Sequence, residues 1–129
     1  MDLLATHPVK KSDLGFHGNL FGGKLLSWLD AAVAGYAMQT CHTNSMITVS
    51  IDKCIFTRPA KEGNLVKIYA KVARMGNTSA TFEVEVRSYN VFTEEEIIIL
   101  TTSMTFVRID DEGGPIPISE QVKRIFNSK

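Results

Sequence analysis

The longest apolar stretch of the chain begins at a pair of glycines and ends about twenty residues later. Its large apolar residues recur at spacings of three and four, so the pattern predicts one long helix from about Gly22 to about Cys41. Apolar residues cover nearly its whole circumference, and we therefore expect the helix to be buried on most sides. Lys24, Ser27 and Asp30 interrupt the stretch too often for a membrane span.

The segment before this helix is rich in turn-forming residues. We expect one edge strand within residues 1–12, because Pro8 lacks the N–H that an inner strand needs. A loop follows, and Asn19 is expected to cap the helix. Gly22 and Gly23 allow the backbone to come close to another group at the helix start.

Four stretches after the helix alternate between apolar and polar residues, which is the period of a half-buried strand. The first stretch ends at Arg58-Pro59 and places its large apolar residues on one face: Ile47, Val49, Ile51 and Ile55. The other three stretches cover about residues 66–73, 81–87 and 96–109.

One long helix followed by consecutive strands with short connections predicts an α+β domain with an antiparallel sheet. The apolar face of the sheet can wrap the helix, and about five strands around one long central helix form the hotdog arrangement. In the polar tail, residues 119–129, we expect a short helix packed by Val122, Ile125 and Phe126. The chain has no internal repeat, and we expect a single domain over residues 1–129.

Composition narrows the class of protein. The chain has 129 residues with 14 basic and 14 acidic side chains, so it lacks the basic surface of a nucleic-acid-binding protein. Its first residues lack the basic and apolar regions of a signal peptide, and we expect a cytoplasmic protein without a membrane anchor. Cys41 and Cys54 form no metal-ligand pattern with histidine, and both are expected to be small, half-buried and reduced. Common nucleotide, serine-hydrolase and zinc motifs are absent, so no metal and no separate cofactor is predicted.

Asp30 is the one acidic residue of the predicted helix. Its neighbours three and four residues away are not basic, so no ion pair along the helix holds it. A buried, unpaired carboxylate is strongly unfavourable because it loses its hydration. Two interpretations follow. Asp30 lies with Ser27 on a narrow solvated stripe, or it is kept in a dry pocket as a general base or nucleophile.

The start of the helix is the second candidate for chemistry. Its first turn leaves backbone N–H groups free at Gly22 and Gly23, at the positive end of the helix dipole, where they can stabilise an oxyanion. Asp30 lies about 10–12 Å further along at 1.5 Å per residue, too far for both groups of one chain to reach one carbon atom. We therefore hypothesise a two-fold dimer in which one chain supplies the helix start and the other the carboxylate.

Four segments of the chain occur in a recognisable order: residues 17–30 (HGNLFGGKLLSWLD), 56–64 (FTRPAKEGN), 75–79 (MGNTS) and 84–88 (VEVRS). Together they resemble the hotdog-fold acyl-CoA thioesterases of the YciA and cytosolic acyl-CoA hydrolase group, and the resemblance covers about residues 13–117. It implies hydrolysis of a fatty acyl-CoA to the free acid and coenzyme A, which is part of the substrate and not a separate cofactor.

The resemblance also implies roles for individual residues. Asp30 matches the family's catalytic aspartate, and the backbone amide of Gly22 or Gly23 would polarise the thioester carbonyl. The expected contacts to coenzyme A are made by Arg58, Gly76, Thr78, Ser79 and Arg87. The family assembles as dimers that build a trimer of dimers or a tetramer.

Three positions depart from the family's pattern. Gly15 stands where the family often has an asparagine that helps to position the water or the carbonyl, and His17 or Asn19 would have to take over that role. Asn77 replaces an arginine, which removes one positive charge near coenzyme A, and Asn64 replaces an aspartate in a turn. The departures allow for low activity or an altered substrate.

A second hypothesis, from a different class, is a hotdog module that binds acyl-CoA or a fatty acid without hydrolysing it. A dehydratase on the same fold is less consistent with the sequence, because the usual Asp/His pair of those enzymes is not evident.

Overall fold

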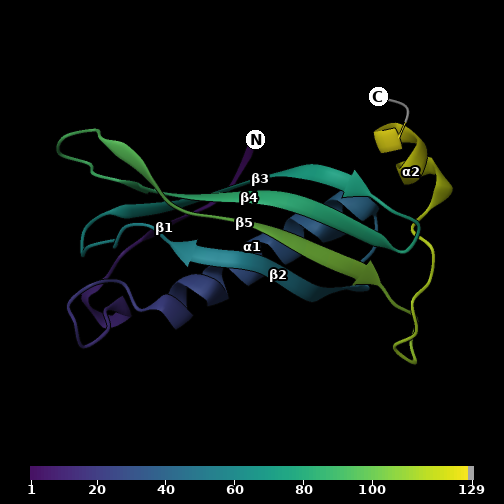
Figure 1. Cartoon of the computed structure of the whole chain (residues 1–129), viewed down its shortest axis with the longest axis horizontal. Coiled ribbons are helices and arrows are strands. Elements are labelled where there is room, and N and C mark those ends of the chain that lie inside the picture. The colour runs from purple at the N-terminus through teal and green to yellow at the C-terminus, as the bar shows by residue number, and fades with distance from the viewer. Residues whose placement is uncertain (128–129) are drawn as a thin grey trace.

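The computed structural model describes residues 1–127 and consists of one antiparallel sheet packed against one long helix (Figure 1). The helix is α1 (Gly22–Cys41), and the strands in chain order are β1 (Asp2–Pro8), β2 (Met46–Phe56), β3 (Leu65–Met75), β4 (Ser79–Tyr89) and β5 (Glu96–Arg108). A 3-10 turn, η1 (Lys11–Asp13), precedes α1, and a short helix, α2 (Glu120–Asn127), follows the sheet. The predicted α+β class and the predicted bounds of the long helix are confirmed.

The strands lie in the order β1-β3-β4-β5-β2, so β1 and β2 form the two edges of the sheet. Helix α1 crosses one face and contacts all five strands. The inner strands β3 and β4 alternate as predicted, and their buried side chains meet the helix: Val66, Ile68, Ala70, Phe82, Val84 and Val86. Phe82 lies at the centre of this core, in edge-to-face contact with Phe106 and Tyr36 at centroid distances of 5.8 and 5.6 Å.

Only one side of α1 is buried within the chain. Its buried residues follow one another at every fourth position: Leu25, Leu29, Val33, Ala37 and Cys41. Ala31, Gly35 and Gln39 on the other side are exposed. The expectation that the helix is buried on most sides is therefore wrong for the single chain, because the sheet forms one layer and covers the helix from one direction only.

Strand β2 differs most from its predicted pattern, because it contains two β-bulges. The register against β5 shifts between Thr48 and Ser50 and again between Asp52 and Ile55. Each bulge inserts one extra residue and so exchanges the two faces of the strand. The second bulge contains Lys53, whose φ of 37° is unusual for a residue with a Cβ.

Because the two exchanges cancel, only the stretch between the bulges, with Ile51, is turned relative to the two ends of β2. Thr48 and Phe56 pair with the buried Phe106 and Leu100 and so lie on the helix side of the sheet. Ile47 and Ile55, at 44% and 62% exposure, lie on the other side. The prediction that Ile47, Val49, Ile51 and Ile55 share one apolar face is therefore wrong. Ile51 pairs with the buried Met104 of β5 and so faces the helix, unlike Ile47 and Ile55.

The start of α1 also differs from its prediction. The residue that caps the helix is Phe21, and its carbonyl accepts the N–H groups of Lys24 and Leu25. The prediction that Asn19 is the cap is wrong, because Asn19 lies two residues too early and its N–H and carbonyl groups bond within the preceding loop.

The remaining elements agree with the sequence in part. Helix α2 confirms the helix expected in the tail, whose last two residues lie outside the described range. Val122 is buried and Phe126 packs against the core, whereas Ile125 is half exposed and does not pack as predicted. Both cysteines are unpaired, and Cys54 is half-buried as predicted, whereas Cys41 is fully buried. Burial raises the pKa of each thiol, which is typical of unreactive residues. Within residues 1–127, neither helix has the length and apolar character that crossing a membrane requires.

The end of α1 offers a test of the backbone geometry. The helix ends at His42, which has a left-handed backbone (φ 54°, ψ 43°) and donates its N–H to the carbonyl of Met38. Glycine is the usual residue at such a position, because a Cβ is unfavourable there. We expect His42→Gly to raise the free energy of unfolding by about 0.5–1 kcal/mol, measured by chemical denaturation. The control His42→Ala keeps the Cβ and should not be stabilised. An equally stabilised alanine variant would contradict the backbone explanation.

Candidate active site

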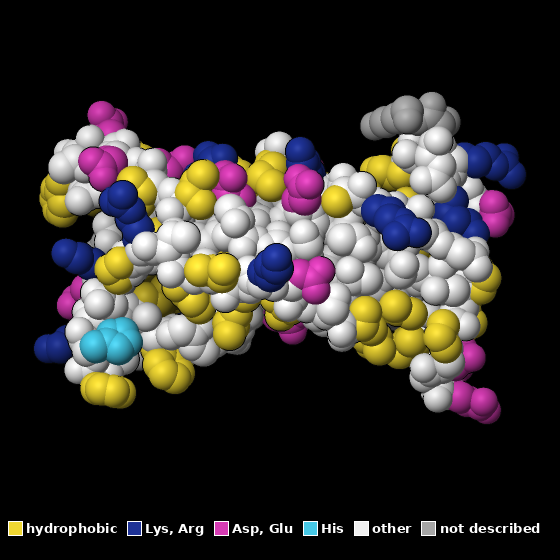
Figure 2. Space-filling view, in the orientation of Figure 1, with side chains coloured by type: hydrophobic (Ala, Val, Ile, Leu, Met, Phe, Trp, Pro, Cys, Tyr) yellow, Lys and Arg dark blue, Asp and Glu magenta, His cyan; other side chains and the backbone are white. Residues whose placement is uncertain are grey.

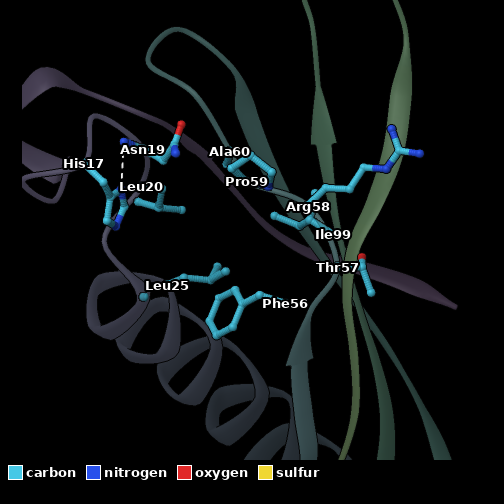
Figure 3. Close-up of a pocket in the computed structure, with 11 residues that line it drawn as sticks. His17, Asn19, Leu20, Leu25, Phe56, Thr57, Arg58, Pro59, Ala60 and Ile99 are labelled. Atoms are coloured by element: carbon cyan, nitrogen blue, oxygen red, sulfur yellow. Dashed lines mark hydrogen bonds between the residues drawn. The ribbon is translucent and has the colours of Figure 1, made fainter.

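A cavity of about 380 Å³ opens between the start of α1, the loop before it and the segment that follows β2 (Figure 3). Its volume lies within the usual range of small-molecule sites. The apolar part of the wall consists of Leu20, Leu25, Phe56, Ala60 and Ile99. The cavity also brings together four of the predicted site residues: His17, Asn19, Gly22 and Arg58. A cavity with both apolar and polar walls suits a ligand that carries both an apolar chain and a polar group.

The loop before α1 is held by its own backbone and by two neighbouring segments. Within the loop, the N–H of Gly15 donates to the carbonyl of Asn19 at 2.8 Å, and the N–H of Gly18 donates to the carbonyl of Gly15 at 3.0 Å. Outside it, the N–H of Leu20 donates to the carbonyl of Ala60 at 2.8 Å. His17 and Asn19 are therefore carried by a closed turn that is tied to the opposite wall of the cavity.

Asp13, which was not among the predicted site residues, supports this loop through contacts on both of its sides. Asp13 is 3% exposed, and one of its carboxylate oxygens accepts the N–H of Lys10 at 2.9 Å. The other carboxylate oxygen lies 3.6 Å from the Nζ of Lys24, at the start of α1. The backbone carbonyl of Asp13 accepts the N–H of Phe21. The signal available in the sequence was weak, namely an acidic residue three positions after Lys10, as in a capping box.

The two glycines at the start of α1 have different surroundings. A Cβ on Gly23 would lie 2.9 Å from Cε2 of Phe21, so glycine is required there for the Phe21 ring to fold back over the backbone. Gly22 lines the cavity, and a Cβ there would lie 3.7 Å from the ring tip of Phe56. The first helical N–H groups have no partner within the helix. Gly22 lines the cavity and Gly23 does not, so the candidate N–H donor in the cavity wall is that of Gly22.

Asp30 lies outside the cavity of its own chain. It is half buried, and its Oδ1 accepts a hydrogen bond from the Oγ1 of Thr48 on β2 at 2.7 Å. Ser27, its expected companion on a solvated stripe, is exposed. Eight residues separate Asp30 from Gly22, or about 12 Å along the helix. The carboxylate is thus partly dry and held by one hydroxyl, at the edge of the sheet formed by β2.

The predicted contacts in the turn between β3 and β4, at residues 76–79, lie far from the cavity within one chain. Residues 56–60 line the cavity and shortly precede β3, whereas the turn at residues 76–79 follows the other end of β3. An extended strand of this length spans about 35 Å. The C-terminal segment packs on this turn: Ile118 donates its N–H to the carbonyl of Asn77, and Lys123 donates from Nζ to the Asn77 side chain at 2.8 Å.

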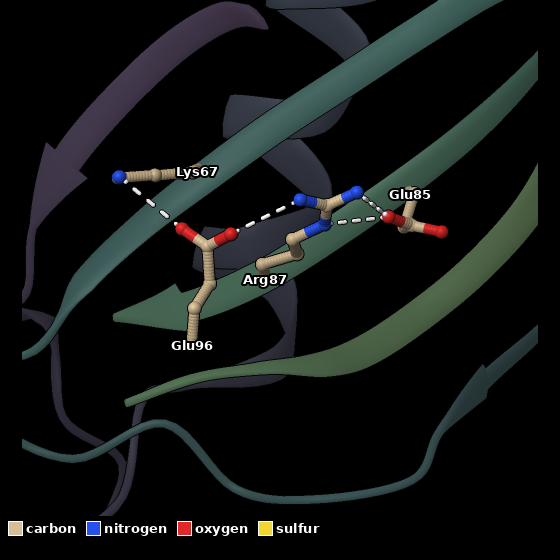
Figure 4. Close-up of polar contacts among 4 residues, drawn as sticks. All are labelled: Lys67, Glu85, Arg87 and Glu96. Carbon is tan, nitrogen blue, oxygen red and sulfur yellow. Dashed lines mark hydrogen bonds and ion pairs between the residues drawn. The ribbon is translucent and has the colours of Figure 1, made fainter. Parts of the chain in front are cut away.

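Arg87 belongs to a network of charges on the face of the sheet away from α1 (Figure 4). Its guanidinium pairs with Glu85 and, at 3.0 Å, with Glu96, which also pairs with Lys67 at 3.2 Å. It also stacks over the ring of Tyr69 at 4.2 Å. The hydrogen bonds to Glu96 and Glu85 raise the pKa of Arg87, and the bond from Arg87 lowers the pKa of Glu96. This guanidinium is already occupied by two carboxylates.

Comparison with known proteins places the chain among thioesterases. Residues 17–91 match the model of the Thioesterase superfamily. The chain is 30% identical to the uncharacterized acyl-CoA thioester hydrolase YkhA of Bacillus subtilis over 93% of this chain and 69% of that protein. It is 29% identical to the acyl-CoA thioester hydrolase YciA of Escherichia coli over 88% of each chain.

A solved structure extends the similarity to three dimensions. A hexameric hotdog fold thioesterase of Campylobacter jejuni matches with a TM-score of 0.88 and 33% identity, over 98% of this chain and 97% of that one. The predicted hotdog fold is therefore confirmed.

The network around Arg87 predicts a pH-dependent contribution to stability. Because the folded-state pKa of Glu96 is depressed, its pairing stabilises the fold above the ordinary carboxylate pKa of about 4.3 and is lost as the pH falls through the lower folded-state pKa. We expect Glu96→Gln to lower the free energy of unfolding by about 0.5–1 kcal/mol at pH 7, with the difference shrinking as the medium is acidified.

Denaturation curves between neutral and acidic pH measure this difference. Glu112→Gln, which changes an exposed glutamate after β5, is the control. A Glu96→Gln effect that does not vary with pH would contradict the role assigned to the ion pairs.

Proposed function

Because the chain belongs to the thioesterase superfamily and is a thioester hydrolase, we propose that it hydrolyses fatty acyl-CoA to the free fatty acid and coenzyme A. One observation carries the proposal. The half-buried carboxylate of Asp30 is held by the hydroxyl of Thr48 on the open edge strand, where a second chain can reach it. A module that only bound an acyl chain would gain nothing from this carboxylate, because its partial dehydration is unfavourable.

The edge strand β2 is the surface through which we propose that two chains pair. It is 11 residues long, and Ile47, Val49 and Ile55 on it are 44%, 51% and 62% exposed. Figure 2 shows apolar side chains in two groups, toward the two ends of the region where β2 runs in Figure 1, with basic and acidic side chains between them. A long apolar edge strand is prone to aggregate unless something covers it. A second copy of the same strand covers it with backbone hydrogen bonds as well as apolar contacts.

The same pairing brings the separated halves of the site together. If two β2 strands run antiparallel about their middle residue, Ile51, then Met46 lies opposite Phe56 of the second copy and Thr48 lies opposite its Cys54. Phe56 lines the cavity beside Gly22, and Thr48 holds Asp30. Two-fold symmetry therefore moves each carboxylate toward the cavity of the other copy, which removes the gap of about 12 Å within one chain.

The proposed reaction uses these groups as follows. The N–H of Gly22 donates a hydrogen bond to the thioester carbonyl oxygen and stabilises the negative charge that develops there. In one route, Asp30 from the other copy takes a proton from a water molecule as the water oxygen bonds to the carbonyl carbon, and the C–S bond then breaks, so that its electron pair leaves with sulfur as the coenzyme A thiolate. In the other route, the carboxylate of Asp30 bonds to that carbon itself, the C–S bond breaks with loss of the same thiolate to leave an anhydride, and water then hydrolyses the anhydride to the free acid and the Asp30 carboxylate. A thiolate is a good leaving group, so no dedicated general acid is required.

The apolar wall of the cavity is proposed to hold the acyl chain, and Arg58 at its rim to bind a phosphate of coenzyme A. Arg58 is exposed, and its guanidinium points away from the cavity centre in Figure 3, toward the side from which a long polar ligand would enter. Gly76, Thr78 and Ser79 are too distant to join this path in one chain, so any contact of theirs with coenzyme A must come from another copy. Arg87 would have to release Glu85 and Glu96 to bind phosphate.

Further assembly is proposed from the relatives. The Campylobacter jejuni thioesterase is described as hexameric, and we propose that three β2-paired dimers form a hexamer here, with a tetramer as the alternative. The exposed side of α1, with Ala31 and Gly35, is a second surface that such assembly can cover.

The role of Asp30 is tested by substitution. We expect Asp30→Asn to lower turnover at least about a hundredfold, because the amide cannot accept a proton from water or attack carbon. The amide oxygen still accepts the Thr48 hydroxyl, so the fold should persist. Thiol release measured over a series of acyl-CoA chain lengths gives the readout, and Asp111→Asn, at an exposed position after β5, is the control. Full activity of the Asp30→Asn variant would show that the assignment is wrong.

Sharing of the site between chains is tested by mixing two inactive variants. Gly22→Pro removes the proposed N–H donor, and proline is well accommodated at the first position of a helix. Alone, this variant and Asp30→Asn should each be nearly inactive. Coexpressed, they form mixed dimers with one intact site, so about a quarter of all sites should recover if pairing is random.

Gly22→Ala keeps the N–H and serves as the matched variant, which should retain at least about a tenth of the turnover. If the mixture stays as inactive as its components, the two groups act within one chain.

A further inference from the structure

We propose that the imidazole of His17 is a catalytic hydrogen-bond donor, whose Nε2–H and the N–H of Gly22 together bind the thioester carbonyl oxygen. This inference rests on the proposed hydrolysis of acyl-CoA and adds a group to the site. Both residues line the same cavity, His17 from the loop before α1 and Gly22 from its first turn. In Figure 3 the His17 ring extends from the loop toward the start of the helix.

The hydrogen bonds of the ring assign its proton. The backbone N–H of Asn19 donates to Nδ1 of His17 at 3.2 Å. A ring nitrogen that accepts a hydrogen bond carries no proton, so the neutral imidazole carries its proton on Nε2. The nitrogen that remains for a ligand is therefore a donor, which is the kind of group that a carbonyl oxygen requires.

His17 is exposed, and its ring lies beside Gly15, whose lack of a side chain leaves room for it. A Cβ on residue 15 would lie 3.1 Å from Nε2 and 3.4 Å from Cε1 of His17. The imidazole therefore occupies the space beside Gly15 into which a side chain at that position would extend. In the proposed site, Gly15 leaves this space open, and the histidine fills it and supplies the donor.

The loop keeps this arrangement in place. The hydrogen bonds between Gly15 and Asn19 and between Gly18 and Gly15 close the turn around His17, and Leu20 anchors it to Ala60. A donor on such a turn needs little reorganisation when charge develops on the carbonyl oxygen. No proton leaves His17 in the reaction: the ring donates a hydrogen bond to the oxyanion and returns to its initial state when the C–S bond breaks.

Two substitutions separate the donor from the structural role of the ring. In His17→Asn, the side-chain oxygen can still accept the N–H of Asn19, but the Nε2–H is gone. In His17→Gln, the longer side chain places an amide N–H at about the reach of Nε2. We expect His17→Asn to lower kcat at least about a hundredfold with little change in KM, and His17→Gln to keep at least about a tenth of the wild-type kcat.

A rescue variant tests the shared space. Adding Gly15→Asn to His17→Asn should restore kcat at least about tenfold, because the new amide enters the space that the ring has vacated. Gly15→Asn alone should lower kcat, since its Cβ would displace the ring.

The outcomes distinguish this inference from the proposed function. If the wild-type protein releases no thiol from any acyl-CoA, the proposed function fails. If the wild type is active and His17→Asn keeps its kcat, or if the asparagine and glutamine variants lose activity equally, the role of His17 is overturned while the function stands. Circular dichroism of each variant shows whether the fold is kept.

Discussion

The hydrogen bond from Thr48 to Asp30 is the interaction on which the rest of the site depends. It joins the central helix to the edge strand β2, and it holds a carboxylate that lies half buried in a mostly apolar helix. In the proposed function, a second chain paired along this free edge of the sheet brings the ligand to the carboxylate. The position of one acidic residue then connects the proposed chemistry with the proposed assembly.

Strand β2 carries this geometry at both of its ends. Its two bulges exchange the faces of the strand twice, so Thr48 and Phe56 share the helix side, and only the stretch between the bulges, with Ile51, is turned relative to strict alternation. Thr48 reaches Asp30 at one end of the strand, and Phe56 lines the cavity beside Gly22 at the other end. Lys53 keeps an unusual backbone conformation at the second bulge, and such local strain is typically found where a strand serves a functional site.

The sequence predicts the regular parts of the fold well and the irregular parts poorly. The bounds of α1 and the alternation of β3 and β4 follow from apolar periods, which depend on neighbouring residues only. The second bulge of β2 contains a left-handed lysine, a backbone conformation that no local rule favours. The depth of burial of α1 depends on how many layers surround it. Likewise, the pairing of Arg87 with Glu96 follows from the register of β4 and β5, which brings together residues nine positions apart. The family resemblance named Asp30 and Gly22, whereas the cavity wall of Phe56 and the support from Asp13 required the structure.

The central claim is that each active site combines the carboxylate of one copy with the helix start of another. A crystal structure with coenzyme A bound tests it most directly. We expect the sulfur of coenzyme A to lie between the Gly22 backbone of one copy and the Asp30 carboxylate of a second copy, across paired β2 strands. A ligand flanked by Asp30 and Gly22 of the same copy, or an Asp30 carboxylate facing bulk solvent in the assembled protein, would contradict the claim.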